Sequence, residues 1–440
     1  MFANRFFAIC PCICLIAGVA TAGEPVSFAT EVAPFLVDQC LVCHNTKTAK
    51  GRFSLETYSA LIKGGESGPA VVPRDVDSSN LWLLVESGEM PKDGDPLSAE
   101  QLAALKRWIA EGAALPDEKL ALQPLAAIIP KQVQPSPPAE YRAAVPVTAL
   151  AFHPDGNTIA VSGYREVLVF NVGDGRLTRR IQNLAERIHG LSFSPDGQRL
   201  AVAAGTPGRM GEVKLFEAQT GDLVADLATS VDSFFDVTFS PDGSRLAASG
   251  SDRTIRIWNV ADLSEALRIE DHADWVTAVV FSPDGTRLAT SSRDKTAKVF
   301  DVATGESLVT FAEHEQPVLD VLFTPDGEGV VSCGKDRRLR IWNMSDAKEI
   351  KNHKFRGDVT SLASISSDAF LCGSADRTVR IFGNDGEQRR SFEQPDWVLS
   401  VSVSKDGQKI ALGSYDGTVS IKDATTGEDL WTIKSMPPKA

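Results

Sequence analysis

The chain has 440 residues, of which 43% are hydrophobic and 23% charged, and its formal net charge is −13. This length exceeds that of one small domain, so at least two domains are expected. The acidic balance argues against nucleic-acid binding, because neutralising phosphates requires clustered lysine and arginine.

The N-terminus has the pattern of a secretory signal peptide over residues 1–22. Arg5 precedes an apolar run over residues 8–20, and small residues form a cleavage site just before Gly23. The run is too short to span a bilayer easily, and no later segment is long and apolar enough to be a transmembrane helix. We therefore expect an exported protein, periplasmic or otherwise extracytoplasmic, with no integral membrane segment after cleavage. A retained N-terminal anchor is the alternative.

Residues 23–116 have the periodicity of a small helical domain. Ser98 resembles an N-cap with Gln101 three residues later, a capping box that opens a helix over residues 99–111 before Gly112. The apolar positions of the two clearest expected helices are Phe28, Val32, Phe35 and Leu36 in the first, and Leu102, Leu105, Trp108 and Ile109 in the second.

The segment from Cys40 to His44 is a Cys-x-x-Cys-His motif. Two thiols at this spacing can each add to one vinyl group of a haem, and the next residue places an imidazole under the iron. A thioredoxin-like redox pair requires a βαβ setting, and a zinc site requires a second Cys or His pair; this region has neither. We predict one covalently attached haem c, bound by Cys40 and Cys43, with His44 as the proximal axial ligand.

Met90 is the only methionine between this motif and the proline-rich segment that follows, and no second histidine lies there. A thioether ligand stabilises Fe(II) and raises the reduction potential. The alternative is that Met90 covers the pocket as a flexible apolar residue. Its position before Pro91, in a loop leading to the last helix, favours a role as the distal axial ligand.

These residues resemble the planctomycete-type cytochrome c domain, itself similar to small class I cytochromes c. Beyond the haem motif, the resemblance rests on Gly51-x-x-Ser54-Leu55, Gly64-Gly65-x-x-Gly68-Pro69-Ala70, Ser79-x-Leu81, Met90-Pro91 and Trp108-Ile109-x-x-Gly112-Ala113. It implies a small all-α, class I-like fold with His44 proximal and Met90 distal. Pro73-Arg74 departs from the expected Pro-Gly, which bears on the turn and not on the ligands.

Residues 117–142 are rich in proline. The prolines are Pro124, Pro130, Pro135, Pro137 and Pro138. This density prevents a long helix or a central strand and predicts a semi-rigid linker.

Residues 143–434 contain a repeated turn. Phe-x-Pro-Asp-Gly ends at Gly156, Gly197, Gly243, Gly285 and Gly327, with spacings of 41, 46, 42 and 42, and a weaker version ends at Gly407. Each turn joins two alternating strands, and two more strands complete each unit. A four-stranded unit repeated at about 40 residues is the signature of a propeller blade. The seven expected blades span residues 143–183, 184–229, 230–272, 273–314, 315–354, 355–394 and 395–434.

This part resembles the WD40 repeat family over about 290 residues. The resemblance rests on the segment 251–259, Ser-Asp-Arg-Thr-Ile-Arg-Ile-Trp-Asn, and on His272 and His314 before their blades. In this family a His, a strand Ser or Thr, a turn Asp and a Trp form a hydrogen-bonded network. The fifth blade has all four, as His314, Ser332, Asp336 and Trp342, whereas the fourth has His272, Thr290 and Asp294 with Phe300 in place of Trp. Every blade can be drawn with its own fourth strand, which leaves the mode of ring closure open.

Two pairs of side chains have structural interpretations. Cys333 and Cys372 lie in adjacent blades, one strand position out of register, which predicts opposite faces, no disulfide and buried thiols. Trp82 and Trp108 are expected to pack in the core rather than to conduct electrons.

A haem with both axial positions filled has no open site for substrate, and the sequence shows no constellation of acid, base or nucleophile. We therefore expect electron transfer or redox sensing with a redox partner protein, and no enzyme activity. By its resemblance the propeller is a rigid platform for a protein partner.

Two alternatives stay open. One is a redox enzyme whose propeller contains a second catalytic cofactor, as in nitrite reductases that join cytochrome c to a propeller. That reading needs ligands at the propeller centre, whereas the histidines lie near blade starts or turns. They are His153, His189, His272, His314 and His353. The other is a non-catalytic scaffold with a structural haem domain.

Overall fold

The computed structural model describes residues 25–41, 43–45, 50–92, 96–115, 118–129 and 133–434. The chain divides into two compact units, Met1–Gln132 and Val133–Ala440. The predicted signal peptide, residues 1–22, lies outside the described residues. Among the helices that the structure does describe, none combines the length and the apolar character needed to cross a bilayer.

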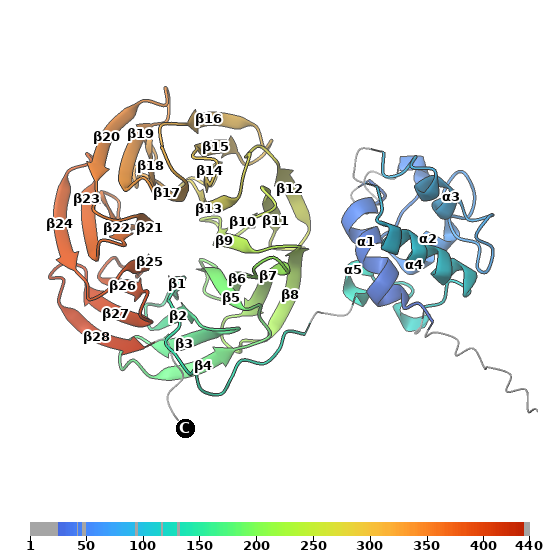
Figure 1. Cartoon of the computed structure of the whole chain (residues 1–440), viewed down its shortest axis with the longest axis horizontal. Helices are drawn as coiled ribbons and strands as arrows, with labels where there is room; N and C mark the ends of the chain where they lie inside the picture. The colour runs from blue at the N-terminus through green and yellow to red at the C-terminus, as the bar shows by residue number, and fades with distance from the viewer. Residues whose placement is uncertain are drawn as a thin grey trace, which may run out of the picture. The chain divides into compact units, whose positions relative to one another are not determined.

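The first unit is small and contains short helices around one apolar core (Figure 1). Its helices are η1 (Phe28–Val32), α1 (Ala33–Phe35), η2 (Leu36–Cys40), η3 (Lys50–Arg52), α2 (Tyr58–Lys63), α3 (Asn80–Glu86), α4 (Ala99–Ala110), η4 (Glu118–Leu120) and α5 (Leu125–Ile128). The predicted capping box is present at the start of α4. Ser98 Oγ accepts a hydrogen bond from the Gln101 backbone N–H at 3.2 Å, and Gln101 Oε1 accepts one from the Ser98 N–H at 2.8 Å.

The core of this unit forms around Trp108. Its indole stacks at a tilt on Phe28, with ring centroids 4.8 Å apart, and its Nε1 donates to the Ala114 carbonyl at 3.1 Å. Trp82 is also buried, so both tryptophans pack in the core as predicted. Leu125 is fully buried in the same cluster, because the chain after residue 116 folds back onto this unit through α5. The first half of the segment expected to be a linker therefore contributes to the core.

The second unit is a seven-bladed propeller, which confirms the sequence prediction. Seven antiparallel sheets surround a central channel, and each consists of four consecutive strands (Figure 1). The first four blades are β1 (Leu150–Phe152), β2 (Thr158–Ser162), β3 (Val167–Asn171), β4 (Leu177–Ile181); β5 (Arg187–Phe193), β6 (Arg199–Thr206), β7 (Met210–Glu217), β8 (Leu223–Ser230); β9 (Phe234–Phe239), β10 (Arg245–Gly250), β11 (Ile255–Asn259), β12 (Glu265–Ile269); and β13 (Val276–Phe281), β14 (Arg287–Ser292), β15 (Ala297–Asp301), β16 (Ser307–Phe311). The remaining three are β17 (Val318–Phe323), β18 (Gly329–Gly334), β19 (Arg338–Asn343), β20 (Glu349–Lys354); β21 (Val359–Ser366), β22 (Ala369–Ser374), β23 (Thr378–Gly383), β24 (Gln388–Glu393); and β25 (Val398–Val403), β26 (Lys409–Ser414), β27 (Thr418–Asp423), β28 (Asp429–Lys434).

The repeated Pro-Asp-Gly turn closes the first hairpin of a blade by local hydrogen bonds. In the third blade, Ser240 Oγ donates to Asp242 at 2.6 Å and accepts from the Arg245 N–H at 2.9 Å. Gly243 then takes a φ of +72°, a left-handed conformation that costs glycine little. This local chemistry explains why the turn spacing alone predicted the blades.

The ring closes without exchange of strands between the two ends of the chain. The first and seventh blades each form their sheet from their own four strands. Val147, which precedes β1, joins them: its N–H donates to the Ser414 carbonyl at 3.1 Å, and its carbonyl accepts from Ser400 Oγ at 2.9 Å. The seam between these blades is thus held by side-chain packing and by a few hydrogen bonds, which also include Phe152 N–H to Ser402 Oγ at 3.2 Å and Trp431 Nε1 to the Val172 carbonyl.

Residues 133–142, the second half of the expected linker, are attached to the propeller by buried polar groups; we call them the strap. Gln134 donates to Glu212 at 3.1 Å, and its N–H donates to Asn183 at 2.7 Å. Tyr141 donates to Glu166, a wholly buried carboxylate, at 2.5 Å. The propeller fold therefore begins structurally at the strap.

Cys333 and Cys372 are both fully buried thiols, as predicted. Cys333 pairs with Asp320 on β17, whereas Cys372 pairs with Leu362 on β21, so they do lie one strand position out of register. The difference in register does not, however, keep the two thiols apart. Neighbouring blades turn opposite faces toward each other, and the two thiols share one apolar cluster between the fifth and sixth blades.

Candidate haem site and propeller channel

The Cys-x-x-Cys-His motif begins at the end of η2 and continues as a tight turn. The N–H groups of Cys43 and His44 both donate to the Cys40 carbonyl, at 3.2 and 3.1 Å. Because one carbonyl accepts both bonds, the backbone turns within four residues and brings the two cysteines and the histidine into one loop. This is the local geometry that the motif requires.

The state of the side chains fits haem attachment. Cys40 and Cys43 are present as thiols. Burial, with a smaller contribution from Cys43, raises the pKa of Cys40 to about 11. A redox-active cysteine pair has the opposite property, a lowered thiol pKa, so the thioredoxin-like alternative is disfavoured. His44 Nδ1 is buried and has no hydrogen-bond partner among the described residues. The donor set itself, two thiols and one imidazole in a single loop, fits a c-type haem.

Met90 lies in the same small unit. Its side chain is partly buried against the apolar core that also contains Cys40, and its N–H donates to the Leu84 carbonyl at 3.0 Å at the end of α3. Cys40, Cys43, His44 and Met90, the four residues predicted to bind a haem, therefore lie in one compact unit. No group of three or more His, Cys, Asp or Glu side chains placed for a metal ion occurs in the part of the chain that the structure covers.

Phe53 is a residue of this site that sequence reasoning missed. Its ring centroid lies 5.2 Å from that of His44, and the next-but-one residue, Leu55, donates its N–H to the His44 carbonyl at 2.6 Å. Gly65 approaches Phe53 so closely that a Cβ there would lie 2.9 Å from the phenylalanine Cβ. The glycine landmarks at residues 51 and 64–65 were the available signal, since they permit this packing.

The hydrogen-bonded network predicted for the fifth blade is present. His314 Nδ1 donates to Asp336 at 2.8 Å, and its Nε2 lies 2.7 Å from Ser332 Oγ, which also accepts from Trp342 Nε1 at 2.7 Å. Burial alone would raise the pKa of Asp336, but the hydrogen bond and charge of His314 outweigh it and hold the pKa below its usual value. The network ties the loop before β17 to strands β18 and β19 and to the turn between them.

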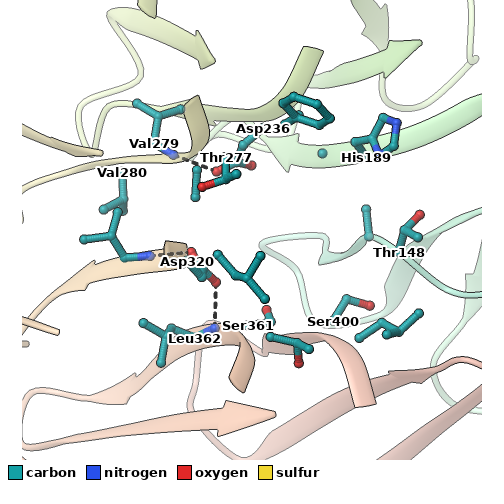
Figure 2. A pocket seen from close by; sticks show the side chains of 18 of the residues that line it. Thr148, His189, Asp236, Thr277, Val279, Val280, Asp320, Ser361, Leu362 and Ser400 are labelled. Atoms are coloured by element: carbon teal, nitrogen blue, oxygen red, sulfur yellow. Dashed lines mark hydrogen bonds between the residues drawn. The ribbon is translucent and has the colours of Figure 1, made fainter. Parts of the chain in front are cut away.

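The channel along the propeller axis has a volume of about 850 Å³. Figure 2 shows Asp236 and Asp320 facing this cavity from β9 and β17. Loss of hydration raises the pKa of each carboxyl to about 7. Asp236 accepts the Val279 N–H at 3.0 Å, and Asp320 accepts the Leu362 N–H at 2.7 Å. Each aspartate therefore links its own first strand to that of the next blade, which is a structural role.

His189 also lines the channel (Figure 2). The sequence places all five propeller histidines near blade starts or turns. It does not indicate that a side chain at the start of a blade can face the propeller axis. The other four bond within or between blades: His153 to Gly197, His272 to Asp294, His314 to Asp336 and His353 to Gly386. By contrast, Nε2 of His189 is buried without a hydrogen-bond partner in the described residues.

Acidification is expected to destabilise the propeller through His189. Burial, and then the charge of Arg187, lower the pKa of His189 from 6.5 to about 4. As pH falls from 6.5 toward 4, the unfolded chain binds a proton that the folded chain does not, so stability falls by at most about 1.4 kcal/mol per pH unit. The difference in unfolding free energy between wild type and His189→Gln, measured by urea unfolding across this range, should change with that slope. A difference that stays constant across this range would contradict the prediction.

Two families of known proteins match the chain. The family described as Planctomycete cytochrome C matches residues 40–94, from the first haem-motif cysteine to just past Met90. The family described as WD domain, G-beta repeat matches residues 137–171, 214–259, 264–301, 305–343, 346–383 and 386–423. Comparison with curated proteins found no match.

Fold and site together define the class of protein: a cytochrome c-like domain joined to a seven-bladed β-propeller. The repeat matches cover more than half of the sequence, and the chain belongs to the WD40 repeat family. The segment between the first two matches, residues 172–213, contains most of the second blade, whose strands β6 and β7 are longer than the corresponding strands of the other blades and pair out to Thr206 and Met210. That blade follows the repeat in structure while departing from it in sequence.

Proposed function

We propose that this protein is exported, attaches one haem c covalently, and transfers electrons or senses redox state, with the propeller as a platform for a protein partner. The observation that supports this most directly is the turn at Cys40–His44, where two thiols and an imidazole lie in one loop of a cytochrome c-like domain. The haem would supply reversible one-electron chemistry. We assign the domain to the small all-α, class I-like cytochromes c.

In this proposal each residue has a distinct task. Cys40 and Cys43 hold the group covalently, His44 is the proximal ligand, and Met90 is the distal ligand. The domain order is a signal peptide over residues 1–22, a cytochrome domain from residue 23 whose core includes Leu125 of α5, and a propeller that begins with the strap and ends at residue 434. Covalent attachment keeps the cofactor in place outside the cytoplasm, and filled axial positions favour electron transfer over substrate binding. The partners are a redox protein for the haem and a second protein for the propeller.

Replacing Met90 with alanine is expected to lower the reduction potential, because the thioether preferentially stabilises Fe(II). The change should be on the order of 0.1 V, within the roughly 0.8 V range that axial ligands cover. Spectroelectrochemical titration of the full chain measures it, and the visible spectrum should move toward high spin. Met344→Ala is the control, since Met344 lies in the propeller. An unchanged potential and a low-spin spectrum in Met90→Ala would assign the distal position to another group.

A further inference from the structure

A groove of about 630 Å³ opens on the propeller where the first and seventh blades meet; we call it the seam groove. Thr148, Thr360 and Leu399 line both the groove and the central channel, so the two spaces are adjacent. Its wall also contains Trp397 and Tyr415. The groove therefore lies at the mouth of the channel, beside the ring-closing seam.

The groove exists because the first blade lacks a bulky loop before its first strand. The fourth, fifth and sixth blades have His272, His314 and Phe355 in this loop, all buried. The corresponding part of the first blade, residues 143–146, is Ala-Ala-Val-Pro, and it lines the groove. Small side chains at this point leave the space that the larger loops fill in those blades.

Two large aromatic side chains are exposed in the groove. Trp397 is 46% exposed and Tyr415 is 52% exposed, and their ring centroids are 5.3 Å apart. The Tyr415 N–H donates to the Trp397 carbonyl at 2.9 Å, so the turn between β26 and β27 and the loop before β25 hold the two rings together. Rigid, exposed Trp and Tyr side chains beside a depression are typical of binding hot spots.

Three arginines lie in the groove wall or in the loops that form it. Arg187 lines the groove, and Arg356 and Arg377 lie in the two sixth-blade loops whose Asp358 and Ala375 line it. All three arginines are exposed, and within residues 133–434 none forms an ion pair.

Most carboxylates near the groove are already neutralised. Glu186 pairs with Arg165, Asp376 with Arg380, and Asp416 with Lys434. Asp358 lines the groove and Asp396 precedes Trp397, and neither forms an ion pair within residues 133–434. Three unpaired arginines against these two carboxylates leave a positive excess of one around the groove, although the chain as a whole has a net charge of −13.

From this arrangement we propose that the seam groove binds an extended acidic segment of a partner protein. One aromatic or branched apolar side chain of that segment packs on Trp397 and Tyr415, and carboxylates on either side of it pair with Arg187, Arg356 and Arg377. The apolar contact offsets the cost of ordering the segment, and the charges select its sequence and speed its association. This inference rests on the proposed role of the propeller as a platform, and it names the partner's chemistry.

The test uses the full chain and a fluorescein-labelled nine-residue peptide with a central phenylalanine flanked by aspartate and glutamate. Fluorescence anisotropy should show saturable binding that weakens as salt rises. A peptide with lysine in place of its acidic residues should bind at least about tenfold more weakly. Trp397→Ala should weaken binding of the acidic peptide by about tenfold or more. Arg187→Glu should weaken it as well, and should improve binding of the lysine peptide.

Trp275→Ala is the matched control, because Trp275 is a comparably exposed tryptophan, at 36%, that lines the channel but not the seam groove. It should leave the affinity unchanged. Absence of binding, equal binding of the lysine peptide, or equal losses in Trp397→Ala and Trp275→Ala would overturn the inference. The label reports binding without haem absorbance, so such a failure leaves the haem proposal intact. Conversely, loss of haem should leave the titration unchanged.

Discussion

Glu212→Ala is expected to lower the free energy of unfolding of the propeller by about 3–5 kcal/mol. Glu212 and Lys214 are each 1% exposed and lie 3.0 Å apart on β7. The carboxylate also accepts the Ala185 N–H at 2.5 Å and the Gln134 side chain of the strap at 3.1 Å. Its removal leaves a buried ammonium with only Asp226, 3.6 Å away, as a counter-charge. Urea unfolding, followed by circular dichroism, measures the loss as a lower midpoint.

Two further variants separate the buried ion pair from other causes. Glu217→Ala removes a carboxylate from the same strand, but that side chain is 41% exposed and pairs with Arg199 at the surface, so the cost should stay below about 1 kcal/mol. Replacing both buried charges, as Glu212→Leu with Lys214→Met, should be less destabilising than Glu212→Ala alone, because no unpaired charge remains. A double variant as unstable as the single one would show that packing, and not charge, determines the effect.

The architecture of the propeller could be predicted because its signal is local and repeated. Each Pro-Asp-Gly turn is closed by hydrogen bonds within six residues, as at Ser240–Arg245, so its spacing reports the blades directly. The fifth-blade network was predictable for a similar reason. Its His, Ser, Asp and Trp each occupy a fixed position of the repeat, so the sequence shows that all four are present. Ring closure had no such signal, because the contacts of Val147 with Ser400 and Ser414 join the two ends of the propeller.

The features that sequence reasoning missed depend on segments far apart in the chain. In the sequence, Glu212 and Lys214 resemble exposed charged residues of a strand. In the structure, Gln134 of the strap bonds to Glu212, and both charges are buried. His189 lines the channel at an irregularity of β5 between Ile188 and Gly190, in the first strand of its blade. Cys333 and Cys372 share a core because two blades pack face to face. In each case the environment of the residue depends on how distant elements are placed relative to one another, and a local sequence pattern does not predict that placement.

The candidate haem residues were predictable because covalent attachment constrains a five-residue segment. The environment of His44 was not, since Phe53 approaches it through the glycine-rich packing of residues 51–65. For Met90, the sequence indicates the residue but not its environment. Its identity followed from being the only methionine in the domain, whereas its partly buried position against the core is a property of the fold.

The double variant Cys40→Ala/Cys43→Ala is expected to lose covalently bound haem completely. No other cysteine lies in the described residues of the first unit, so no thioether could form there. Expression in a host with periplasmic haem-attachment machinery, followed by haem staining of a denaturing gel, measures this directly. Each single variant retains one thiol and should keep a weaker band, because one thioether is enough to survive denaturation.

The matched control is Cys333→Ala/Cys372→Ala, which removes two thiols from the propeller core and should leave haem staining unchanged. Circular dichroism of the Cys40→Ala/Cys43→Ala chain should still show the propeller, since the cysteines and the blades belong to separate compact units. A stained band of normal intensity in that chain would place attachment outside the motif and remove the basis of the electron-transfer proposal. Loss of the band with an intact propeller would instead allow peptide binding at the seam groove to be measured without haem.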